Sequence, residues 1–240
     1  MKQVLGRFGH SLVWKPLQLL VFCLFGLVGC ATVPTLHELN YTDGAAIATL
    51  SSSVSLAYAS PDKSISGSGV IMYQKPGQFR IVILSPFGSV LQEISIQNQQ
   101  ITILDTGHKI AFTGNLSQIP EQSYFSGWKY IHWLVDNEIA MKSVGDKTVQ
   151  RTGRNGELEK VVYVNGLVSE KSSDTGSSVK YQKYSVIQGI AVPLEILCET
   201  AGKDRLTVTF DEPEVNTPFA RDMFVPKNYI TGIPGRSSSN

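Results

Sequence analysis

The sequence predicts a mainly β, single-domain fold of the α+β class, in which antiparallel strands form a curved sheet. The first observation is a series of β-forming runs between residues 66 and 96, joined by short turns at 75–78 and 85–89. Pro fixes φ at a turn corner and Gly supplies a positive φ, and turns this short pair consecutive strands antiparallel. The second observation is a helical pattern rich in aromatic residues at 121–137. Such a helix needs a wide apolar surface, and the inner face of a curved sheet offers one.

Strands are expected in two groups, one on each side of this helix. The first group is a meander with tight turns, at residues 54–59, 66–74, 79–84, 90–96, 101–104 and 109–113. The second group is expected at residues 139–141, 148–151, 158–164, 179–188, 191–200 and 205–210. A weaker helical pattern predicts a further helix at 36–52, and residues 214–226 are expected to form an extended closing segment.

Residues 1–29 have the features of a targeting segment, with three basic residues and then an apolar stretch at 17–28. This stretch is shorter than the ~20 residues that span a bilayer as a helix. The segment continues into the motif Leu-Val-Gly-Cys at 27–30, which resembles the lipobox of bacterial lipoprotein precursors. The resemblance implies that the signal peptide 1–29 is removed and that Cys30 is acylated on sulfur and nitrogen, with palmitate among the acyl groups. The alternative is an ordinary secretory signal with an accidental Cys.

The expected anchor also bears on location and domain organisation. Several acyl chains make a durable anchor, because each buried CH2 contributes ~0.8 kcal/mol. In the lipoprotein system of Gram-negative bacteria, Asp after the acylated Cys retains a protein in the inner membrane, so Ala31 points by resemblance to the outer membrane. We expect residues 30–35 to be a lipidated tether, 36–230 the folded domain and 231–240 a disordered tail.

Charge indicates which partners are not expected, and cysteine content indicates whether a disulfide can form. The chain has 21 basic and 20 acidic residues, and removal of the three basic residues before Cys30 leaves 18 against 20. No basic stripe is present, so nucleic acid is not expected as a partner. With Cys23 removed and Cys30 acylated, Cys198 cannot form an internal disulfide. We expect Cys198 to be a small buried core residue rather than a nucleophile.

The sequence contains no motif typical of an enzyme or of a cofactor site. Phosphate-binding loops, nucleophile elbows and dinucleotide fingerprints are absent. His37, His108 and His132 have no metal-ligand spacing. We therefore expect a binding or structural protein that is not an enzyme and has no cofactor and no metal.

The strands of the first meander are apolar on both faces, whereas a sheet with one wet face alternates apolar with polar residues. One face therefore packs on a core, and the other needs a second cover or lines a cavity. Which face points inward is open at this stage. The expected cavity residues are Val70, Met72, Phe79, Ile81, Ile83, Ile94 and Ile96 of the strands, with Trp128 and Ile131 of the helix.

The order of these elements resembles the LolB family of outer-membrane lipoproteins, within the LolA/LolB superfamily. The resemblance covers residues 30–210, and its specific residues are Leu-Ser-Pro-Phe-Gly-Ser-Val-Leu-Gln-Glu-Ile at 84–94. The Lys-Pro-Gly-Gln-Phe-Arg corner at 75–80 is more similar to LolA, the soluble carrier. The resemblance implies a strongly curved, unclosed antiparallel β-barrel with helices covering the concave face, and a hydrophobic cavity for acyl chains.

The resemblance also implies a function in lipoprotein transport. A monomer of this type, anchored through Cys30 at the periplasmic face of the outer membrane, acts as a chaperone. It receives lipoproteins from a LolA-like periplasmic carrier and inserts them into the membrane. The segment at 216–227 departs from LolB. An alternative is therefore a structural or envelope-assembly lipoprotein with a different ligand or with a core filled by its own side chains.

Phe87 is the residue that the resemblance assigns to a membrane-insertion loop. It lies between Pro86 and Gly88 at the tip of the second turn, where turns are usually polar. A Phe at this place either projects outward or packs under a neighbouring loop, and single exposed apolar residues are common on protein surfaces.

The lipid anchor leads to a direct prediction. We expect the mature chain to begin at acylated Cys30, so that Cys30→Ser releases the protein from the membrane fraction. Intact-mass analysis and membrane fractionation measure both expectations. An N-terminus elsewhere, or a Cys30→Ser protein that stays with the membrane, would contradict them.

Overall fold

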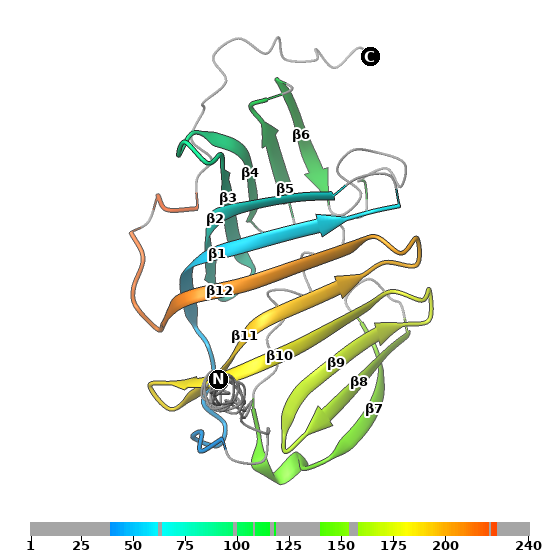
Figure 1. The fold of residues 1–240 in the computed structure, drawn as a ribbon. Coiled ribbons are helices and arrows are strands. Elements are labelled where there is room, and N and C mark those ends of the chain that lie inside the picture. The colour runs from blue at the N-terminus through cyan, green and yellow to red at the C-terminus, as the bar shows by residue number, and fades with distance from the viewer. Residues whose placement is uncertain are drawn as a thin grey trace, which may run out of the picture. The chain divides into compact units, whose positions relative to one another are not determined.

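The computed structural model describes residues 39–61, 64–97, 100–107, 109–115, 118, 140–153, 158–220 and 222–224. Residues 35–240 form one compact unit of the chain, and the strands of this unit make a single sheet (Figure 1). The strands are β1 (Thr49–Ala59), β2 (Ser64–Gln74), β3 (Gln78–Leu84), β4 (Val90–Gln97), β5 (Gln100–Asp105), β6 (Ile110–Asn115), β7 (Lys147–Thr152), β8 (Leu158–Val164), β9 (Leu167–Ser173), β10 (Ser178–Ile187), β11 (Ile190–Glu199) and β12 (Arg205–Val215). Their order in the sheet is β6-β5-β4-β3-β2-β1-β12-β11-β10-β9-β8-β7.

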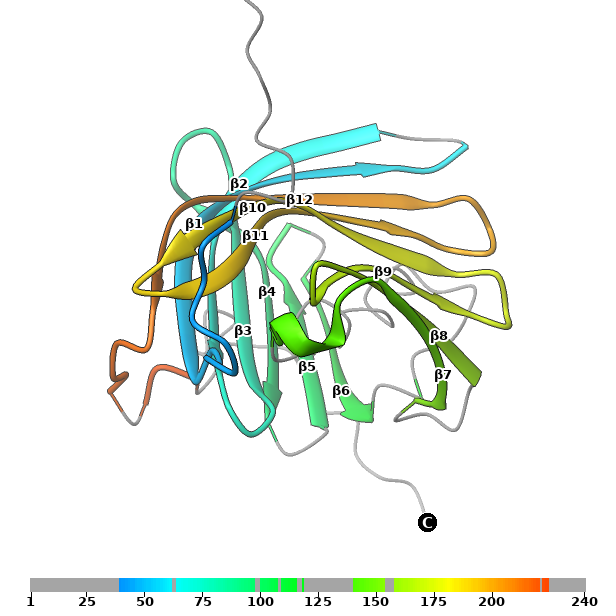
Figure 2. The ribbon, with the colours of Figure 1, turned by 90° about the horizontal axis from the view of Figure 1, so that it is seen from below.

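The sheet consists of two meanders that meet at one long-range pairing. β1 to β6 pair in succession, as do β7 to β12, and every pair is antiparallel. β1 and β12 join the meanders, with Val54 opposite Phe210 and Leu56 opposite Val208. Within the described residues β6 and β7 remain unpaired edges, and Figure 2 shows them as the two ends of the sheet. The prediction of a mainly β fold with an antiparallel, unclosed sheet is confirmed.

β1 and β2 bend along their length, and the sheet turns a corner there (Figure 1). β2 pairs with β1 over its whole length but with β3 only from Ser68 onward. Gly69 lies at this corner, where a Cβ would come within 2.3 Å of the Val82 carbonyl oxygen. Glycine is required because no side chain fits at so close an approach of two strands. In β1 the pairing with β12 shifts between Ser51 and Ser53, which adds a local bend.

The helix predictions are not supported. The described residues contain no α-helix, and the short 3-10 helix η4 (Lys142–Val144) lies among them. The helix predicted at 36–52 is wrong where the structure describes it, because residues 39–48 are irregular and β1 begins at Thr49. Backbone groups of this segment bind other loops, as when the Thr42 N–H donates to the Gly189 carbonyl at 2.7 Å, and the Ala45 N–H closes a turn on the Thr42 carbonyl at 3.2 Å without continuing into a helix. The helix predicted at 121–137 lies outside the described residues.

Two strands of the second group also differ from the prediction. β9 was not predicted, because its Ser-Glu-Lys-Ser-Ser portion has no apolar periodicity. The Asn165-Gly166 hairpin turn that precedes it was the available signal. The strand predicted at 139–141 is wrong in its described part, since Ala140 and Met141 belong to no strand. The Met141 N–H donates instead to the Gly166 carbonyl of that turn at 3.2 Å.

The core confirms the expectation for Cys198. This side chain lies in β11 among the buried apolar residues and is 6% exposed. Burial raises the pKa of its thiol to about 12. A thiol with such a pKa is protonated near neutral pH, whereas nucleophilic cysteines depend on the thiolate.

A buried ion pair lies on the outer face of β3 and β4. Arg80 Nε donates to Glu93 Oε1 at 2.9 Å, and the two side chains are 6% and 1% exposed. Arg80 Nη1 also donates to the Met223 carbonyl at 2.7 Å, and Gln97 Nε2 donates to the carbonyl of the buried Phe224. The pair therefore joins two strands and holds the closing segment after β12 on the outer face of the sheet.

Replacement of Arg80 should destabilise the fold strongly. Within the described part of the chain the second carboxylate oxygen of Glu93 has no hydrogen-bond partner, so Arg80 compensates this buried charge. We expect Arg80→Met to lower the free energy of unfolding by roughly 3–5 kcal/mol, and the double variant with Glu93→Met to recover most of the loss. Chemical denaturation measures both. Arg205→Met, in the exposed pair with Glu199, is the control and should cost less than about 1 kcal/mol. If Arg80→Met and Arg205→Met lowered the free energy of unfolding by the same amount, the prediction would be contradicted.

Cys198 should be protected from alkylation by the fold. At pH 8 we expect iodoacetamide to modify the folded protein roughly a hundredfold more slowly than the protein in denaturant, where the pKa is ~8.5. Because folding raises this pKa, the associated stability is fully present below pH ~8.5 and is lost as the pH rises toward about 12. Mass spectrometry follows the modification, and equal rates with and without denaturant would show that Cys198 is accessible.

Candidate functional site

The concave face of the first meander is mainly apolar. Residues directly opposite each other on neighbouring strands share a face of the sheet. Ile71, Ile81 and Ile94 form one such row across β2, β3 and β4, and none of them is more than 1% exposed. A parallel row consists of Leu50, Tyr73, Phe79, Ile96 and Ile101.

The expected cavity residues divide between the two faces. The structure places Phe79, Ile81, Ile83, Ile94 and Ile96 on the concave face. Val70 and Met72 do not join them and are corrected to the outer face, with Met72 opposite Arg80 and Val70 opposite Val82. Because side chains alternate with a period of two, the choice of face on β2 follows from its register with β3, which the apolar pattern of β2 alone did not reveal. Trp128 and Ile131 lie outside the described residues.

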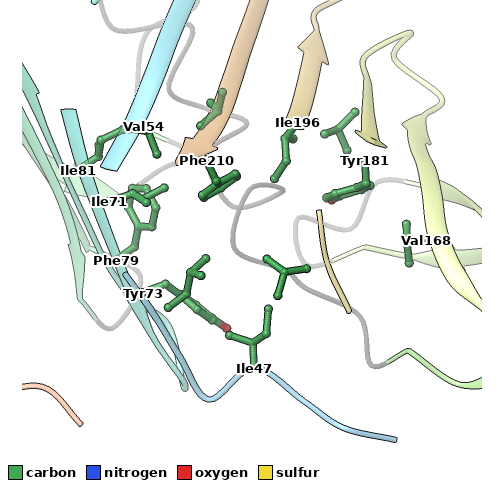
Figure 3. Close-up of a cluster of buried hydrophobic side chains, with 14 of the residues drawn as sticks. Ile47, Val54, Ile71, Tyr73, Phe79, Ile81, Val168, Tyr181, Ile196 and Phe210 are labelled. Atoms are coloured by element: carbon green, nitrogen blue, oxygen red, sulfur yellow. The ribbon is translucent and has the colours of Figure 1, made fainter. Parts of the chain in front are cut away.

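The second meander supplies the opposite wall, which the sequence analysis did not assign to the site. Figure 3 shows Phe210, Ile196 and Tyr181 pointing from β12, β11 and β10 toward Ile71 and Phe79. The alternation of apolar residues in these three strands was the available signal. Assignment to the same cavity required the pairing of β1 with β12.

These walls meet around a very small cavity. It is lined by Ile47, Leu50, Ile71, Tyr73, Phe79, Tyr181, Val192, Pro193, Ile196 and Phe210. The centre of a water molecule can occupy about 20 Å³ of it, which is room for about one water. Ligand pockets for drug-sized molecules are typically ~300–1,000 Å³. The side chains that line this cavity therefore leave little open space between them.

The segment before β1 closes one end of the concave face. Tyr41 and Ile47 are each 3% exposed and pack in the core. The Tyr41 hydroxyl donates to the Asn165 carbonyl at 2.6 Å, and the Gly44 N–H donates to the Ala140 carbonyl at 2.9 Å. These bonds fasten the entry of the chain to two loops of the second meander.

The turn between β3 and β4 presents Phe87 to solvent. Phe87 is 97% exposed, so it does not pack under a neighbouring loop. Ser85 organises the turn: its carbonyl accepts from the Gly88 N–H at 2.9 Å, and its hydroxyl lies 2.7 Å from that of Ser89. Gly88 has φ 79°, which other residues adopt at a cost. The side chain at this tip is held outward by a defined turn.

The described residues show no centre for metal chemistry and no membrane-crossing helix. Among them, no cluster of three or more His, Cys, Asp or Glu side chains could hold a metal ion. No helix in the described ranges is long and apolar enough to cross a bilayer. The three histidines considered from the sequence, His37, His108 and His132, lie outside these ranges.

Solved structures resemble this chain at low sequence identity. A DUF1329 family protein from Desulfovibrio piger is 10% identical with a TM-score of 0.54, and the match covers 74% of this chain and 90% of that one. A candidate outer membrane lipoprotein-sorting protein domain from Vibrio parahaemolyticus is 8% identical with a TM-score of 0.53, covering 74% and 89%. A LolA superfamily protein from Nitrosomonas europaea is 13% identical with a TM-score of 0.47, covering 76% and 91%.

The sequence itself matches a described family. Comparison with curated proteins gives no significant match. The family described as "Outer membrane lipoprotein LolB" matches residues 49–212, from the first residue of β1 into β12. This match spans well over half of the chain and includes both walls of the concave face and the Phe87 turn. The chain therefore belongs to the LolB family of outer membrane lipoproteins.

Proposed function

We propose that this protein is a lipid-anchored lipoprotein of the outer membrane that binds acyl chains on its concave face and delivers lipoproteins into the membrane. Its membership of the LolB family supports outer-membrane location and a role in lipoprotein localisation. In this proposal residues 1–29 are a signal peptide, Cys30 carries the anchor, and a LolA-like periplasmic carrier supplies the lipoprotein to a monomer at the periplasmic face.

The exposed Phe87 is the observation that carries the proposal. A fully exposed Phe on a turn held by Ser85 has no packing role in the folded domain. Burial of a Phe side chain is worth ~2–3 kcal/mol, which biases the tip toward a bilayer without anchoring it. A contact of this strength suits a repeated delivery step, because it forms and breaks readily.

The length of the tether limits the distance between the lipid anchor and the first described residue of the domain. Nine peptide steps separate Cys30 from Leu39, the first described residue, and an extended chain covers at most roughly 30 Å over that length. The anchor thus keeps the domain near the bilayer while leaving it free to turn the Phe87 tip toward the lipid.

The apolar concave face supports acyl-chain binding. Acyl chains are bound chiefly through the apolar area removed from water, with little directional bonding. The rows of isoleucine and aromatic side chains on both walls provide such area. The cavity between the two walls is too small for an acyl chain, so binding at this place requires the walls to separate.

The small cavity also favours a second candidate function. A concave face filled by its own side chains suits a structural or envelope-assembly lipoprotein that carries no acyl chain. The two functions differ in a measurable property: the first requires acyl-chain uptake and transfer, and the second requires neither.

Phe87→Glu should separate transfer from folding. In a chain that begins at residue 31, we expect the variant to melt within about 2 °C of the wild type, since exposed substitutions change stability by about 0.5 kcal/mol or less. Binding of a fluorescent acyl probe should be unchanged. In the acylated protein, transfer of a lipoprotein from the carrier to liposomes should fall roughly tenfold or more, because a charged tip does not enter the bilayer.

Leu158→Glu is the matched control. Leu158 is an apolar residue on β8, outside the turn, and its side chain is 49% exposed. It should leave transfer intact. Equal transfer by Phe87→Glu and wild type would overturn the role of Phe87. Absence of acyl-probe binding in the wild type would instead favour the structural lipoprotein.

A further inference from the structure

A lysine lies fully buried on the apolar concave face. Lys171 of β9 stands opposite Val161 of β8 and Val179 of β10, and all three side chains are 0% exposed. Opposite residues share a face, so Lys171 belongs to the same surface as Tyr181, two residues after Val179. A charged group in such surroundings is costly to bury unless it is compensated.

Tyr181 lies next to this lysine. The Lys171 ammonium nitrogen lies 5.8 Å from the centroid of the Tyr181 ring, a cation–π distance. Tyr181 itself lines the cavity and, in Figure 3, points toward the opposite wall. The Tyr181 ring is therefore next to both the ammonium and the cavity. Movement of the Tyr181 ring during opening of the concave face would bring the ammonium into contact with a ligand.

Two described carboxylates, Glu159 and Asp105, are buried on the same face of the sheet as Lys171. Glu159, on the adjacent strand, is bound by Arg151 with 2.8 Å between Arg151 Nε and Glu159 Oε2. Asp105 is buried on the same face but in β5, in the other meander. Lys171 and Asp105 each have interactions within the protein, so an arriving anion would exchange with or add to existing contacts.

We propose that the concave face binds an amphiphile with an anionic head group, a carboxylate or a phosphate, which Lys171 holds after the Tyr181 ring moves aside. The inference rests on the proposed acyl-chain binding and restricts the ligand to amphiphiles with an anionic head group. The acylated terminus of a lipoprotein offers chains without an anionic group, so a buried cation is unnecessary for that cargo alone. Fatty acids and phospholipids carry the group that a lysine recognises.

Matched single-chain amphiphiles test the proposal on the chain that begins at residue 31, which retains the compact unit 35–240. Calorimetry compares dodecanoate, dodecyl phosphate, uncharged dodecyl maltoside and cationic dodecyltrimethylammonium below their micelle concentrations. We expect the wild type to bind one or both anionic ligands roughly tenfold more tightly than the uncharged one, and Lys171→Met to lose this preference while keeping the uncharged ligand. The two anionic ligands show whether carboxylate or phosphate is preferred.

Lys171→Arg should retain the preference, and so should Lys180→Met, which removes an exposed lysine of the neighbouring strand β10. An unchanged preference in a folded Lys171→Met would overturn the proposal, as would a wild type that binds all four ligands equally. In the latter case acyl-chain binding itself would stand. If no amphiphile binds, the proposed function fails as well.

A second measurement does not depend on a folded variant. The activated succinimidyl ester of dodecanoate acylates amines near the place where the head group binds. In the wild type we expect peptide mass spectrometry to find Lys171 modified, and excess dodecanoate to suppress this modification but not that of the exposed Lys160 and Lys180. Modification confined to exposed lysines would overturn the proposal.

Discussion

The pairing of β1 with β12 is the constraint on which the rest of the structure depends. Each meander can form by local hairpins, but neither has a second wall for its apolar face until these two strands meet. The seam places Val54 opposite Phe210, so the concave faces of both halves become one surface. Asn216 secures its end: its side-chain oxygen accepts from the Ala48 N–H at 2.7 Å, and its own N–H donates to the Thr49 carbonyl at 2.9 Å. Contacts between residues so far apart in sequence carry a high loop-closure cost, which the burial of both walls offsets.

The two faces of the sheet are stabilised by different interactions. This difference explains why the candidate ligand-binding site lies on the concave face. The outer face of β3 and β4 is held by directional bonds, with Arg80 and Gln97 binding main-chain carbonyls of the closing segment. The concave face is held mainly by apolar contacts, which have no required partner and can be exchanged for those of an acyl chain. Apolar contacts that are lost on opening can be replaced by contacts with an acyl chain, whereas a broken buried ion pair leaves an uncompensated charge. Candidate ligand binding and structural support are therefore separated on opposite sides of the same strands.

The Phe87 turn shows how local chemistry and family membership act together. Its geometry is local, because Ser85, Gly88 and Ser89 make the bonds that shape it. The exposure of Phe87 is not a local property, because it requires that no described neighbour lies over the tip of the turn. The family match extends across this turn, so the exposed aromatic residue belongs to the part of the chain shared with other LolB proteins. Lys171 is different: it lies in β9, which has little apolar pattern, and its burial is seen only in the assembled sheet.

The sequence by itself determined the features that depend on short-range physical chemistry. Alternating apolar residues and Pro/Gly turns were sufficient for the first meander, for most of the second, and for the buried state of Cys198, because strand period and turn geometry are local. It could not decide which face of β2 is concave, so Val70 and Met72 were assigned to the wrong side; both faces of that strand are apolar, and only the register with β3 distinguishes them. It also suggested a helix at 36–52, where backbone bonds to distant loops prevailed over local propensity. The tertiary structure alone decided that β12 joins β1, that Tyr181 and Phe210 face Ile71, and that Lys171 is buried, because each depends on strands brought together from opposite ends of the chain.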